Sequence, residues 1–545
     1  MEIRQLLLFG IFSLSLFFLA DAWQKEHRPA EVLQQAAQQI DTPTPGAQLS
    51  AGGHAAMPAD VSSKVLSGEK IKVRTDFLVA EIDTVGGDLR RLELTQHRDS
   101  EDKNKNFVLM QQDANSTYIA QTGLIGEGLP SHKAVFAAAA KEYQLAAGAD
   151  KLEVRLEAPE TNGVKVAKVY TFHKGSYVID VGYEIANHGA ATIQPHSYFQ
   201  LVRDGKPSAG DSKFVSTYAG PAVYTEAAKF RKVEFSDIDK GKTDYPKNAD
   251  NGWIAMIQHY FVGAWLPQGQ VQREFYTRRL DGGLYSAGVI LPVAAIAPGQ
   301  AGTVHVPLYA GPQDQDSLSK LAPGLELTVD YGWLTVIASP LFALLSWLYK
   351  LVQNWGVAII LLTVLIKLLF YPLSAASYRS MAKMRLVTPK LQKIKEQYGD
   401  DRQRLHQAMV EMYKTEKINP LGGCLPVVVQ IPVFIALYWT LLASVELRHA
   451  PFVLWIQDLS TPDPYYILPI LMGATMIWQS FLNPPPPDPI QAKVMKIMPV
   501  AFSVFFFFFP AGLVLYWLVN NLLSIAQQWQ ITRASEREKP AHGKR

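Results

Sequence analysis

A series of long apolar runs in the C-terminal part of the chain constrains its fold most strongly. The runs cover residues 333–352, 355–370, 421–444, 465–482, 497–509 and 511–526. About 20 apolar residues are needed to cross the hydrocarbon core of a bilayer, where backbone groups must find their partners inside a helix. The pattern therefore predicts a polytopic, α-helical membrane bundle in this part of the chain.

The region before these runs follows a different pattern. Over residues 70–324 apolar residues alternate with polar or small ones, as in Tyr177, Ile179 and Val181, and glycine-containing turns separate the segments. A period of two is typical of strands that bury one face. We therefore expect residues 70–324 to form a large antiparallel β-sandwich. The hydrophobic content of 48% fits a chain that joins such a domain to a membrane bundle.

The chain begins with a short apolar segment, residues 6–20. This segment is short for a membrane span, and an A-x-A pattern at its end fits a signal-peptidase site. A retained anchor over residues 1–22 and a cleaved signal peptide therefore both remain open. Residues 23–69 are rich in Ala, Gln, Pro and Gly and are predicted to be a flexible linker.

The distribution of positive charge orients the predicted spans. Loop 379–417 holds ten Lys and Arg residues and the tail 531–545 holds five more, whereas loop 445–464 holds only Arg448. By the positive-inside rule the first two segments are cytoplasmic and the third lies outside. The β domain then also lies outside, and the basic tail ends in the cytoplasm.

This orientation leaves five spans within a core of residues 354–530. If residues 333–352 also crossed the membrane, the basic loop would lie on the wrong side. We therefore predict that segment 325–353 contains an amphipathic helix lying at the outer interface, with its tryptophans at headgroup level.

The last two apolar runs are short. Residues 497–509 and 511–526 are predicted to form a hairpin that turns at Pro510, the alternative being one long helix kinked there. At about 1.5 Å per residue they reach roughly 20–24 Å, less than a core of about 30 Å. Helices of this length would thin the bilayer around them.

The basic loop is predicted to be a helical hairpin over residues 379–418. Apolar residues recur at helical spacing on both sides of Gly399, and the aspartates that follow it suit a helix N-cap. These apolar residues are Leu391, Ile394, Tyr398, Leu405, Met409 and Met412. The hairpin could meet incoming chains or a ribosome, or it could simply bind anionic lipid.

Lys367 is the most unusual residue of the predicted spans. A charge within a span usually faces the protein interior or a water-filled cavity, although a lysine near the end of a span can also extend to the headgroups. Together with Thr363, Gln430, Tyr516 and Asn520 it could line one hydrated groove. Polar residues at this depth can equally hold helices together.

The sequence carries no recognisable catalytic motif. Its one cysteine, Cys424, cannot form an intramolecular disulfide or a cysteine metal cluster, and no Walker loop or metalloprotease motif is present. We expect no catalytic residue, no metal, no cofactor and no sequence-specific binding of nucleic acid. A solute transporter would predict inverted repeats of broken helices, and an anchored carbohydrate enzyme would predict an acid/base pair in the β domain. Neither pattern is visible in the sequence.

Several short motifs resemble the YidC family of membrane protein insertases. They are VDYGWL at 329–334, NWG at 354–356, YPL at 371–373, SMAKM at 380–384, NPLGGC at 419–424, DPYYILP at 463–469 and FPAGL at 509–513. The resemblance covers nearly the whole chain, including the large outside domain typical of Gram-negative members.

The resemblance implies an inner-membrane protein with six spans, a retained first helix, both termini in the cytoplasm and a periplasmic β-supersandwich similar to sugar-mutarotase folds. It also implies an insertase and chaperone that acts on nascent membrane proteins, alone or with the Sec translocon, in contact with lipids and the ribosome.

The resemblance further implies a hydrophilic groove that carries a cation. Lys367 stands where the family generally has arginine, and Trp517 stands where we expect tyrosine. The positions that match residues contacting the nascent chain are Thr363, Gln430, Phe434, Phe505, Tyr516 and Trp517.

Overall fold

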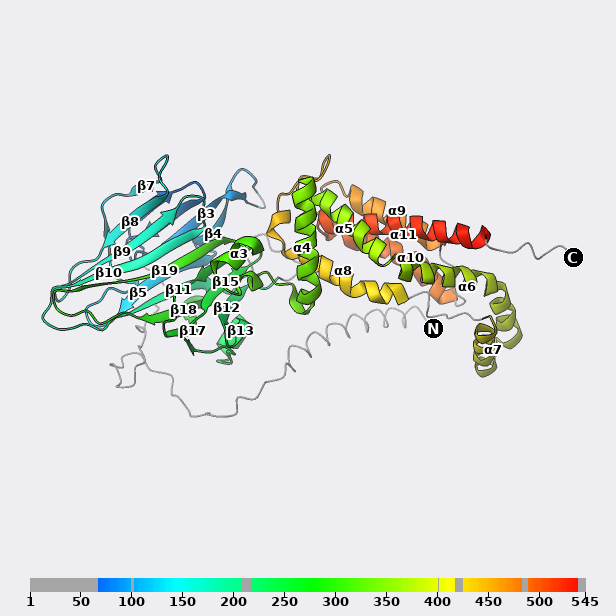
Figure 1. The fold of residues 1–545 in the computed structure, drawn as a ribbon, viewed down its shortest axis with the longest axis horizontal. Helices are drawn as coiled ribbons and strands as arrows, with labels where there is room; N and C mark the ends of the chain where they lie inside the picture. Colours follow the sequence, from blue (N-terminus) through cyan, green and yellow to red (C-terminus); the bar gives the residue numbers. More distant parts are fainter. Residues whose placement is uncertain are drawn as a thin grey trace.

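The computed structural model describes residues 67–99, 102–206, 217–399, 401–416, 425–482 and 489–537. A β-rich domain and a helical bundle follow one another along the longest axis of the molecule (Figure 1). The anchor predicted for residues 1–22, nearly all of the linker and the end of the basic tail lie outside the described residues.

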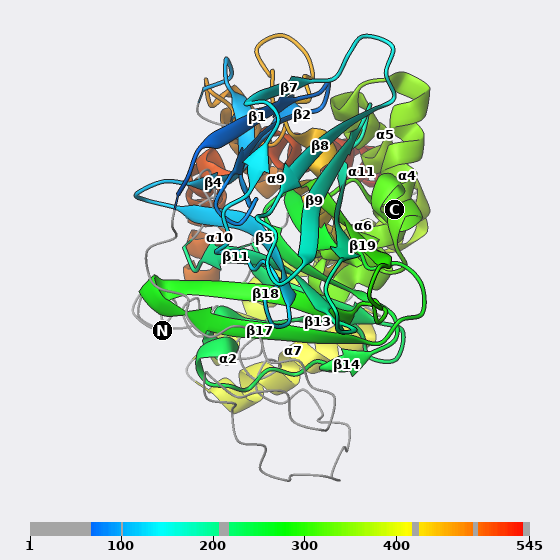
Figure 2. The same ribbon diagram turned by 90° about the vertical axis from the view of Figure 1, so that its left-hand side faces the viewer.

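The β domain is a sandwich of two large, almost entirely antiparallel sheets, as predicted, and Figure 2 views it with the bundle behind. Within the described residues the ten-stranded sheet has the order β14 (Asn248–Ala249), β17 (Arg273–Leu280), β18 (Leu284–Pro292), β11 (His196–Asp204), β5 (Thr117–Ile125), β4 (Asn106–Gln112), β3 (Leu89–Arg98), β2 (Leu78–Asp83), β1 (Lys70–Arg74) and β7 (Glu142–Gln144). The nine-stranded sheet has the order β13 (Lys229–Lys232), β12 (Gly220–Thr225), β15 (Trp253–Gln258), β16 (Phe261–Trp265), β19 (Ala301–Pro312), β10 (Val178–Asn187), β9 (Val164–His173), β8 (Lys151–Glu157) and β6 (Ala137–Ala138).

The alternation seen in the sequence produces the core between the sheets. Along β10 the side chains of Ile179, Val181 and Tyr183 are buried, because successive residues of a strand point to opposite faces. They pack with buried residues of the other sheet, such as Phe199 of β11, in one hydrophobic core. The short helix α2 (Phe235–Asp239) lies beside β17.

The chain leaves the sandwich after β19. It passes through α3 (Gln315–Leu321) and two 3₁₀ turns, Leu325–Thr328 and Gly332–Leu334, into α4 (Thr335–Val352). In Figure 1 helix α4 runs across the end of the bundle that faces the β domain, and it crosses the direction of α5, α8, α9 and α11. Three apolar side chains of α4 are exposed: Val336, Trp347 and Leu351.

Seven further helices follow. They are α5 (Trp355–Leu369), α6 (Tyr371–Tyr398), α7 (Arg402–Thr415), α8 (Leu425–Ala443), α9 (Ile467–Leu482), α10 (Pro489–Phe505) and α11 (Ala511–Arg537). Among the described residues α4 is the one unbroken helix that is long and apolar enough to cross a membrane, and the bent pair α5–α6 makes a second if counted as one span. Shorter apolar helices cover Val429–Ala443, Ile467–Leu482 and Ile497–Phe508.

Three helices extend beyond the limits that the sequence suggested: α10, which begins at Pro489 and not at residue 497, and the helices α6 and α11. The first helix of the basic hairpin begins at Tyr371, directly after a bend of 66° from α5, and not near residue 379. Helix α11 continues eleven residues past Ala526 to Arg537. The reason is the same in each case, because hydropathy marks the change from apolar to polar surroundings while the helical backbone continues through good helix formers.

The chain reverses direction between α10 and α11, as predicted, so one kinked helix is excluded. Helix α11 runs parallel to α9, with Asn521 Nδ2 3.4 Å from Thr475 Oγ1 and Gln528 Nε2 3.1 Å from the carbonyl of Leu482. Helix α10 returns along α9, since the Phe507 ring at its far end lies 5.3 Å from that of Tyr466.

The loop after α8 joins the bundle to the β domain. The guanidinium of Arg448 lies 5.1 Å from the ring centroid of Phe107 and 5.4 Å from that of Phe261. His449 Nε2 lies 3.2 Å from the carbonyl of Arg98, and His259 Nε2 lies 3.1 Å from that of Leu442. Hydrogen bonds and cation–π contacts therefore connect the two regions.

Candidate functional site

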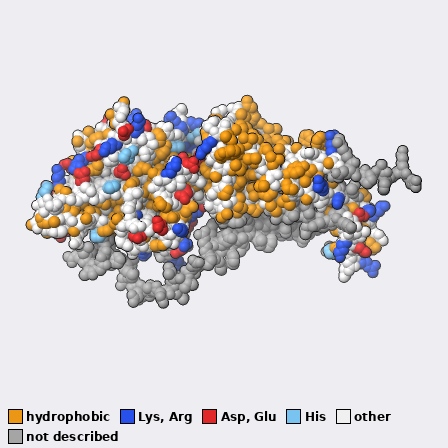
Figure 3. Space-filling model, viewed as in Figure 1, with side chains coloured by type: hydrophobic (Ala, Val, Ile, Leu, Met, Phe, Trp, Pro, Cys, Tyr) orange, Lys and Arg blue, Asp and Glu red, His pale blue; other side chains and the backbone are white. Residues whose placement is uncertain are grey.

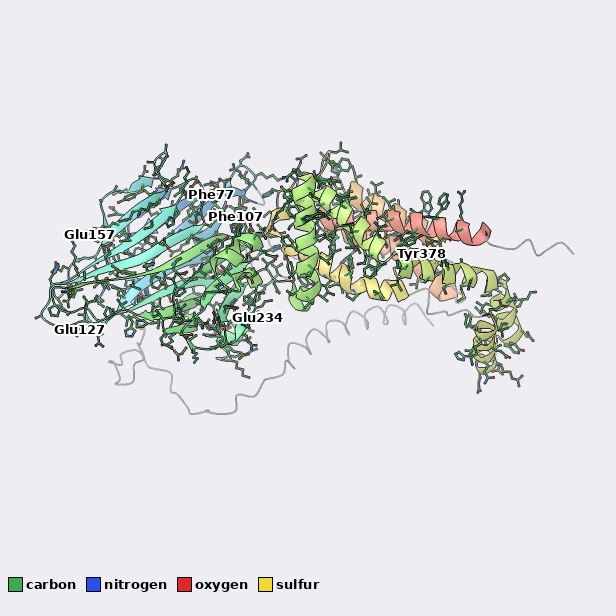
Figure 4. The ribbon with its side chains drawn as sticks, viewed as in Figure 1. Phe77, Phe107, Glu127, Glu157, Glu234 and Tyr378 are labelled. Carbon is green, nitrogen blue, oxygen red and sulfur yellow. The ribbon has the colours of Figure 1, made fainter. Side chains whose placement is uncertain are left out.

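Lys367 lies in the last turn of α5 and points into the bundle. Its side chain is 5% exposed, and Nζ donates a hydrogen bond of 2.7 Å to Ser524 Oγ of α11. The Ser524 hydroxyl donates in turn to the backbone carbonyl of Asn520, at 2.7 Å. Tyr378, labelled in Figure 4, hydrogen-bonds Ser524 from α6. Three helices therefore enclose the ammonium group.

The charge of Lys367 is not neutralised by the part of the bundle that the structure describes. Its ammonium makes no ion pair with a carboxylate of those residues, and its described partner is a neutral hydroxyl. A cation in a site of low dielectric is costly unless water or an anion compensates it. This position therefore favours the approach of a negatively charged group.

Thr363 lies one turn before Lys367 on the same helix, and its side chain is 1% exposed. Its hydroxyl donates to the carbonyl of Ile359 at 2.7 Å, so its proton is already used within the helix. Thr363 therefore contributes a small, buried surface beside Lys367, with its oxygen still able to accept a hydrogen bond.

An aromatic cluster lies on the facing surfaces of α8 and α11. The Phe434 ring stacks on Trp517 with a centroid distance of 4.2 Å and an interplanar angle of 10°, and it lies 6.0 Å from the Tyr516 ring. Trp517 Nε1 is buried and has no hydrogen-bond partner in the described residues. Since an unsatisfied buried donor is unfavourable, this N–H is available to water or to a polar group of a bound chain.

The remaining predicted site residues lie farther from this cluster or have no described contact with it. Gln430 is partly exposed, one turn before Phe434 on α8. Asn520 is partly buried, and the structure gives a bond for its backbone oxygen. Phe505 of α10 is 51% exposed and contacts Phe506 and Phe509 instead. The structure thus brings Lys367 to α11 and Phe434 to Tyr516 and Trp517, but leaves Phe505 on the outside of α10.

Sequence reasoning missed Ser524 and Tyr378. Ser524 follows Tyr516 and Asn520 at successive steps of four residues, so the three share one face of α11. That spacing was a usable signal. Tyr378 carried no such signal, because its position depends on the bend between α5 and α6.

The β domain buries a polar cluster with a different character. Lys168 Nζ donates to the carbonyl of Gly86 at 2.9 Å and lies 5.4 and 5.7 Å from the ring centroids of Tyr170 and Tyr183. Burial raises the pKa of the nearby Asp88 to about 6 and lowers the pKa of Lys168 to about 8. Both side chains are fully buried, so they cannot serve as an acid/base pair for an external sugar. The described residues hold no group of metal-ligating side chains.

Comparison with known proteins shows the family. The YidC periplasmic domain family matches residues 70–344, and the 60Kd inner membrane protein family matches residues 347–539. A crystal structure described as an active YidC insertase with its first transmembrane domain resolved is 19% identical, with a TM-score of 0.39 over 85% of this chain and 92% of that one.

Curated relatives match over nearly their full length. The proteins named membrane protein insertase YidC from Nitrosospira multiformis and Methylobacillus flagellatus are each 60% identical, over 98% of this chain and 98% of theirs. That of Thiobacillus denitrificans is 53% identical over the whole of both chains. Insertion is not an enzymatic reaction, so a carbohydrate enzyme on a membrane anchor is excluded. The chain therefore belongs to the YidC family and is a membrane protein insertase of the inner membrane.

Proposed function

We propose that this insertase guides nascent membrane proteins through a hydrophilic groove in which Lys367 is the attracting cation. The observation that supports the proposal is the buried ammonium group, held by the Ser524 hydroxyl and not neutralised by any described carboxylate. Attraction between unit charges is several-fold stronger in such surroundings than in water. An acidic segment of a substrate would supply the missing negative charge.

The aromatic cluster would guide the apolar part of the substrate. Phe434 and Trp517 present stacked rings that can contact many apolar sequences without selecting one, and Tyr516 lies beside them. The free Trp517 N–H could bind a backbone carbonyl of a chain that has not yet formed its helix. We assign Gln430, Asn520 and Thr363 to the wall of this groove. We assign Phe505 to a site that the substrate contacts as it leaves the groove.

Lysine in place of arginine changes how an anion is held. An ammonium group is a compact charge with three rotatable donors, whereas guanidinium binds a carboxylate through two parallel bonds. Here one of those donors is used by Ser524. We therefore propose transient rather than fixed binding of substrate carboxylates, which suits a site that must release its substrate.

The orientation and partners form the second part of the proposal. We place the β domain in the periplasm and both termini in the cytoplasm, on the basis of the basic loop 379–417 and the basic tail. The α6–α7 hairpin and the tail then face the ribosome. Helix α4 lies at the outer interface among lipids, and the bundle works alone or beside the Sec translocon.

The test of the groove is insertion of one small acidic substrate by four versions of the protein. Lys367→Arg should insert it normally, Lys367→Leu should be impaired, and Lys367→Glu should be worst because it repels the substrate. Neutralising the acidic residues of the substrate should remove most of the difference. The matched control is Lys350→Leu, which removes an exposed cation of α4 and should have no effect. Equal insertion by wild type and Lys367→Glu would remove Lys367 from the mechanism.

A separate test addresses the hairpin. Buried Val387 and Leu391 of α6 pack with Met409 and Met412 of α7, so the hairpin has a small core of its own. Deleting residues 390–416 should therefore impair insertion while the rest of the protein stays folded. Normal insertion by a stable deletion variant would show that the hairpin is only a connection.

A further inference from the structure

The loop between α8 and α9, residues 444–466, ends in an exposed apolar tip formed by Val453 and Leu454. Val453 is 49% exposed and Leu454 is 77% exposed, whereas Ile456 and Leu459 beside them are buried. No residue from Pro451 to Ile456 carries a charge. Two apolar side chains are therefore held outward by a loop at the end of the bundle that faces the β domain (Figure 1). Figure 3 shows hydrophobic side chains over much of the surface of the bundle.

The loop is built to hold this tip in place. The amide of Phe452 donates to the carbonyl of Ile456 at 2.9 Å, and the amide of Leu459 donates to that of Ala450 at 3.1 Å. Trp455 Nε1 donates to Asp463 Oδ1 at 3.0 Å, which ties the tip to the start of α9. Such a closed, internally bonded loop presents its tip rigidly.

Three backbone carbonyls at the tip already accept hydrogen bonds from the protein itself. The carbonyl of Phe452 accepts from Asn354 Nδ2 at 3.0 Å and that of Val453 accepts from the amide of Ile456 at 3.1 Å. The carbonyl of Leu454 accepts from Gln457 Nε2 at 2.9 Å. Carbonyl groups that already have partners can enter an apolar medium without the large cost of unmet hydrogen bonds.

Leu454 also adopts a backbone conformation that its side chain does not favour. Its φ of +54° lies in the left-handed region, which costs a residue other than glycine of order 1 kcal/mol. Asn or Gly would suit this conformation better, but neither would present an apolar side chain. The loop thus carries a strained leucine whose side chain is 77% exposed.

We propose that Val453 and Leu454 insert into the lipid interface of the leaflet on the β-domain side and anchor that end of the bundle. The partner is the glycerol and upper acyl-chain region of a phospholipid bilayer. The loop joins two helices of an inner-membrane bundle, so its connections keep it next to the membrane. Its apolar tip also shares this end of the bundle with the exposed apolar side chains of α4. The inference rests on family membership and not on the groove.

Site-specific fluorescence in lipid vesicles tests the proposal on the full chain. In a Cys424→Ser background, Leu454→Cys is labelled with an environment-sensitive dye, and Val135→Cys, an exposed apolar position of the β domain, is the matched control. Nitroxide groups attached to lipids near the headgroup should quench the dye at position 454 severalfold more than at position 135. Aqueous iodide should do the reverse. Quenching at position 454 by iodide alone, or shielding from both quenchers by a protein cover, would overturn the proposal.

A second variant separates anchoring from folding. Leu454→Asn relieves the unfavourable φ while removing the apolar side chain, so the melting temperature should stay the same or rise. A dye at Val453→Cys should then lose most of its quenching by lipid nitroxides. Unchanged quenching in this stable variant would show that Leu454 is not the anchor.

Discussion

Among the described residues, the β domain and the helical bundle each bury one lysine, and the surroundings of these two lysines differ. Lys168 lies between two tyrosine rings, bonds to a backbone carbonyl and is close to the carboxylate of Asp88. Lys367 bonds to the Ser524 hydroxyl and has no ion pair among the described residues. Figure 4 displays the side chains of both regions.

This comparison distinguishes a buried charge that the surrounding fold compensates from one that the described residues leave without a counter-charge. A buried charge that the fold fully compensates has nothing left to offer a ligand, and removing it damages the fold. A buried charge that the fold leaves uncompensated destabilises the empty protein and attracts an opposite charge. The chemistry of the residue is the same, so its surroundings decide its role.

The largest effect on stability is expected when Lys168, the buried lysine of the β domain, is replaced. Lys168→Met should lower the free energy of unfolding of the β domain by about 3–4 kcal/mol, because buried Asp88 loses one of its two nearby cations, Arg90 remaining at 3.6 Å, and the buried carbonyl of Gly86 loses its donor. Lys165→Met, on an exposed position of the same strand, is the control and should change stability by less than about 0.5 kcal/mol. Denaturant unfolding of the full chain measures both. Adding Asp88→Asn to Lys168→Met should restore part of the loss, and additive effects would deny the coupling.

Acidic pH should weaken the β domain by a smaller amount. Burial lowers the pKa of His97 and of His132 to about 4, from 6.5 in the unfolded chain. Below pH 6.5 the unfolded chain therefore binds protons that the folded domain does not, and stability present at pH 7 is lost as the pH falls towards 4. Asp88, with its pKa raised to about 6, opposes this by taking up a proton in the folded state.

The net loss between pH 7 and pH 5 should be about 2–3 kcal/mol. Thermal unfolding of the β domain at the two pH values checks it. His132→Gln should reduce the pH dependence, since it removes one of the two histidines. A domain equally stable at both values would contradict the prediction.

Arg448 connects the two regions and should have an intermediate effect. Arg448→Gln removes the contacts with Phe107 and Phe261 and should weaken docking of the β domain by about 1–2 kcal/mol. Spin labels at positions 151 and 530 should then show a broader distance distribution. Arg278→Gln, which removes a cation–π contact with Tyr276 inside the β domain, should leave that distribution unchanged.

The smallest effect on stability is expected at Lys367. Lys367→Met should leave the stability of the bundle within about 1 kcal/mol of wild type or raise it, because a membrane cation is unfavourable by about 2.5–3.5 kcal/mol on insertion scales. Unfolding in lipid nanodiscs, followed by a probe on α11, measures this. A loss comparable to that of Lys168→Met would mean that Lys367 is structural after all.

Much of the architecture could be predicted because periodicity reports burial. The alternation of Ile179, Val181 and Tyr183 indicated a strand with one buried face, and the apolar runs marked the helices of the bundle. The ends of the helices were harder to predict from the sequence, because α6 begins at a sharp bend and α11 continues into a polar segment.

The candidate site was predictable only in part. Lys367 was conspicuous as a charge within an apolar run, whereas the partner that holds it is a serine 157 residues away. The four-residue spacing places Ser524 on the face of α11 that carries Tyr516 and Asn520, but only the packing of α5 against α11 pairs it with Lys367. The separation of Phe505 from Phe434 likewise depends on which face α10 turns outward, and the apolar run 497–509 around Phe505, broken only by Ser503, does not encode that choice.

The position of β19 in its sheet has a consequence for biosynthesis. This strand pairs with β16 on one side and β10 on the other, and among the described residues it is the last strand of the domain to be made. Without it the nine-stranded sheet is two separate pieces, β13 to β16 and β10 to β6. The nine-stranded sheet cannot be completed until residue 312 has been synthesised, and α5 begins only about forty residues later. The polypeptide therefore cannot complete this sheet until the segment that leads to the first helix of the core is being made.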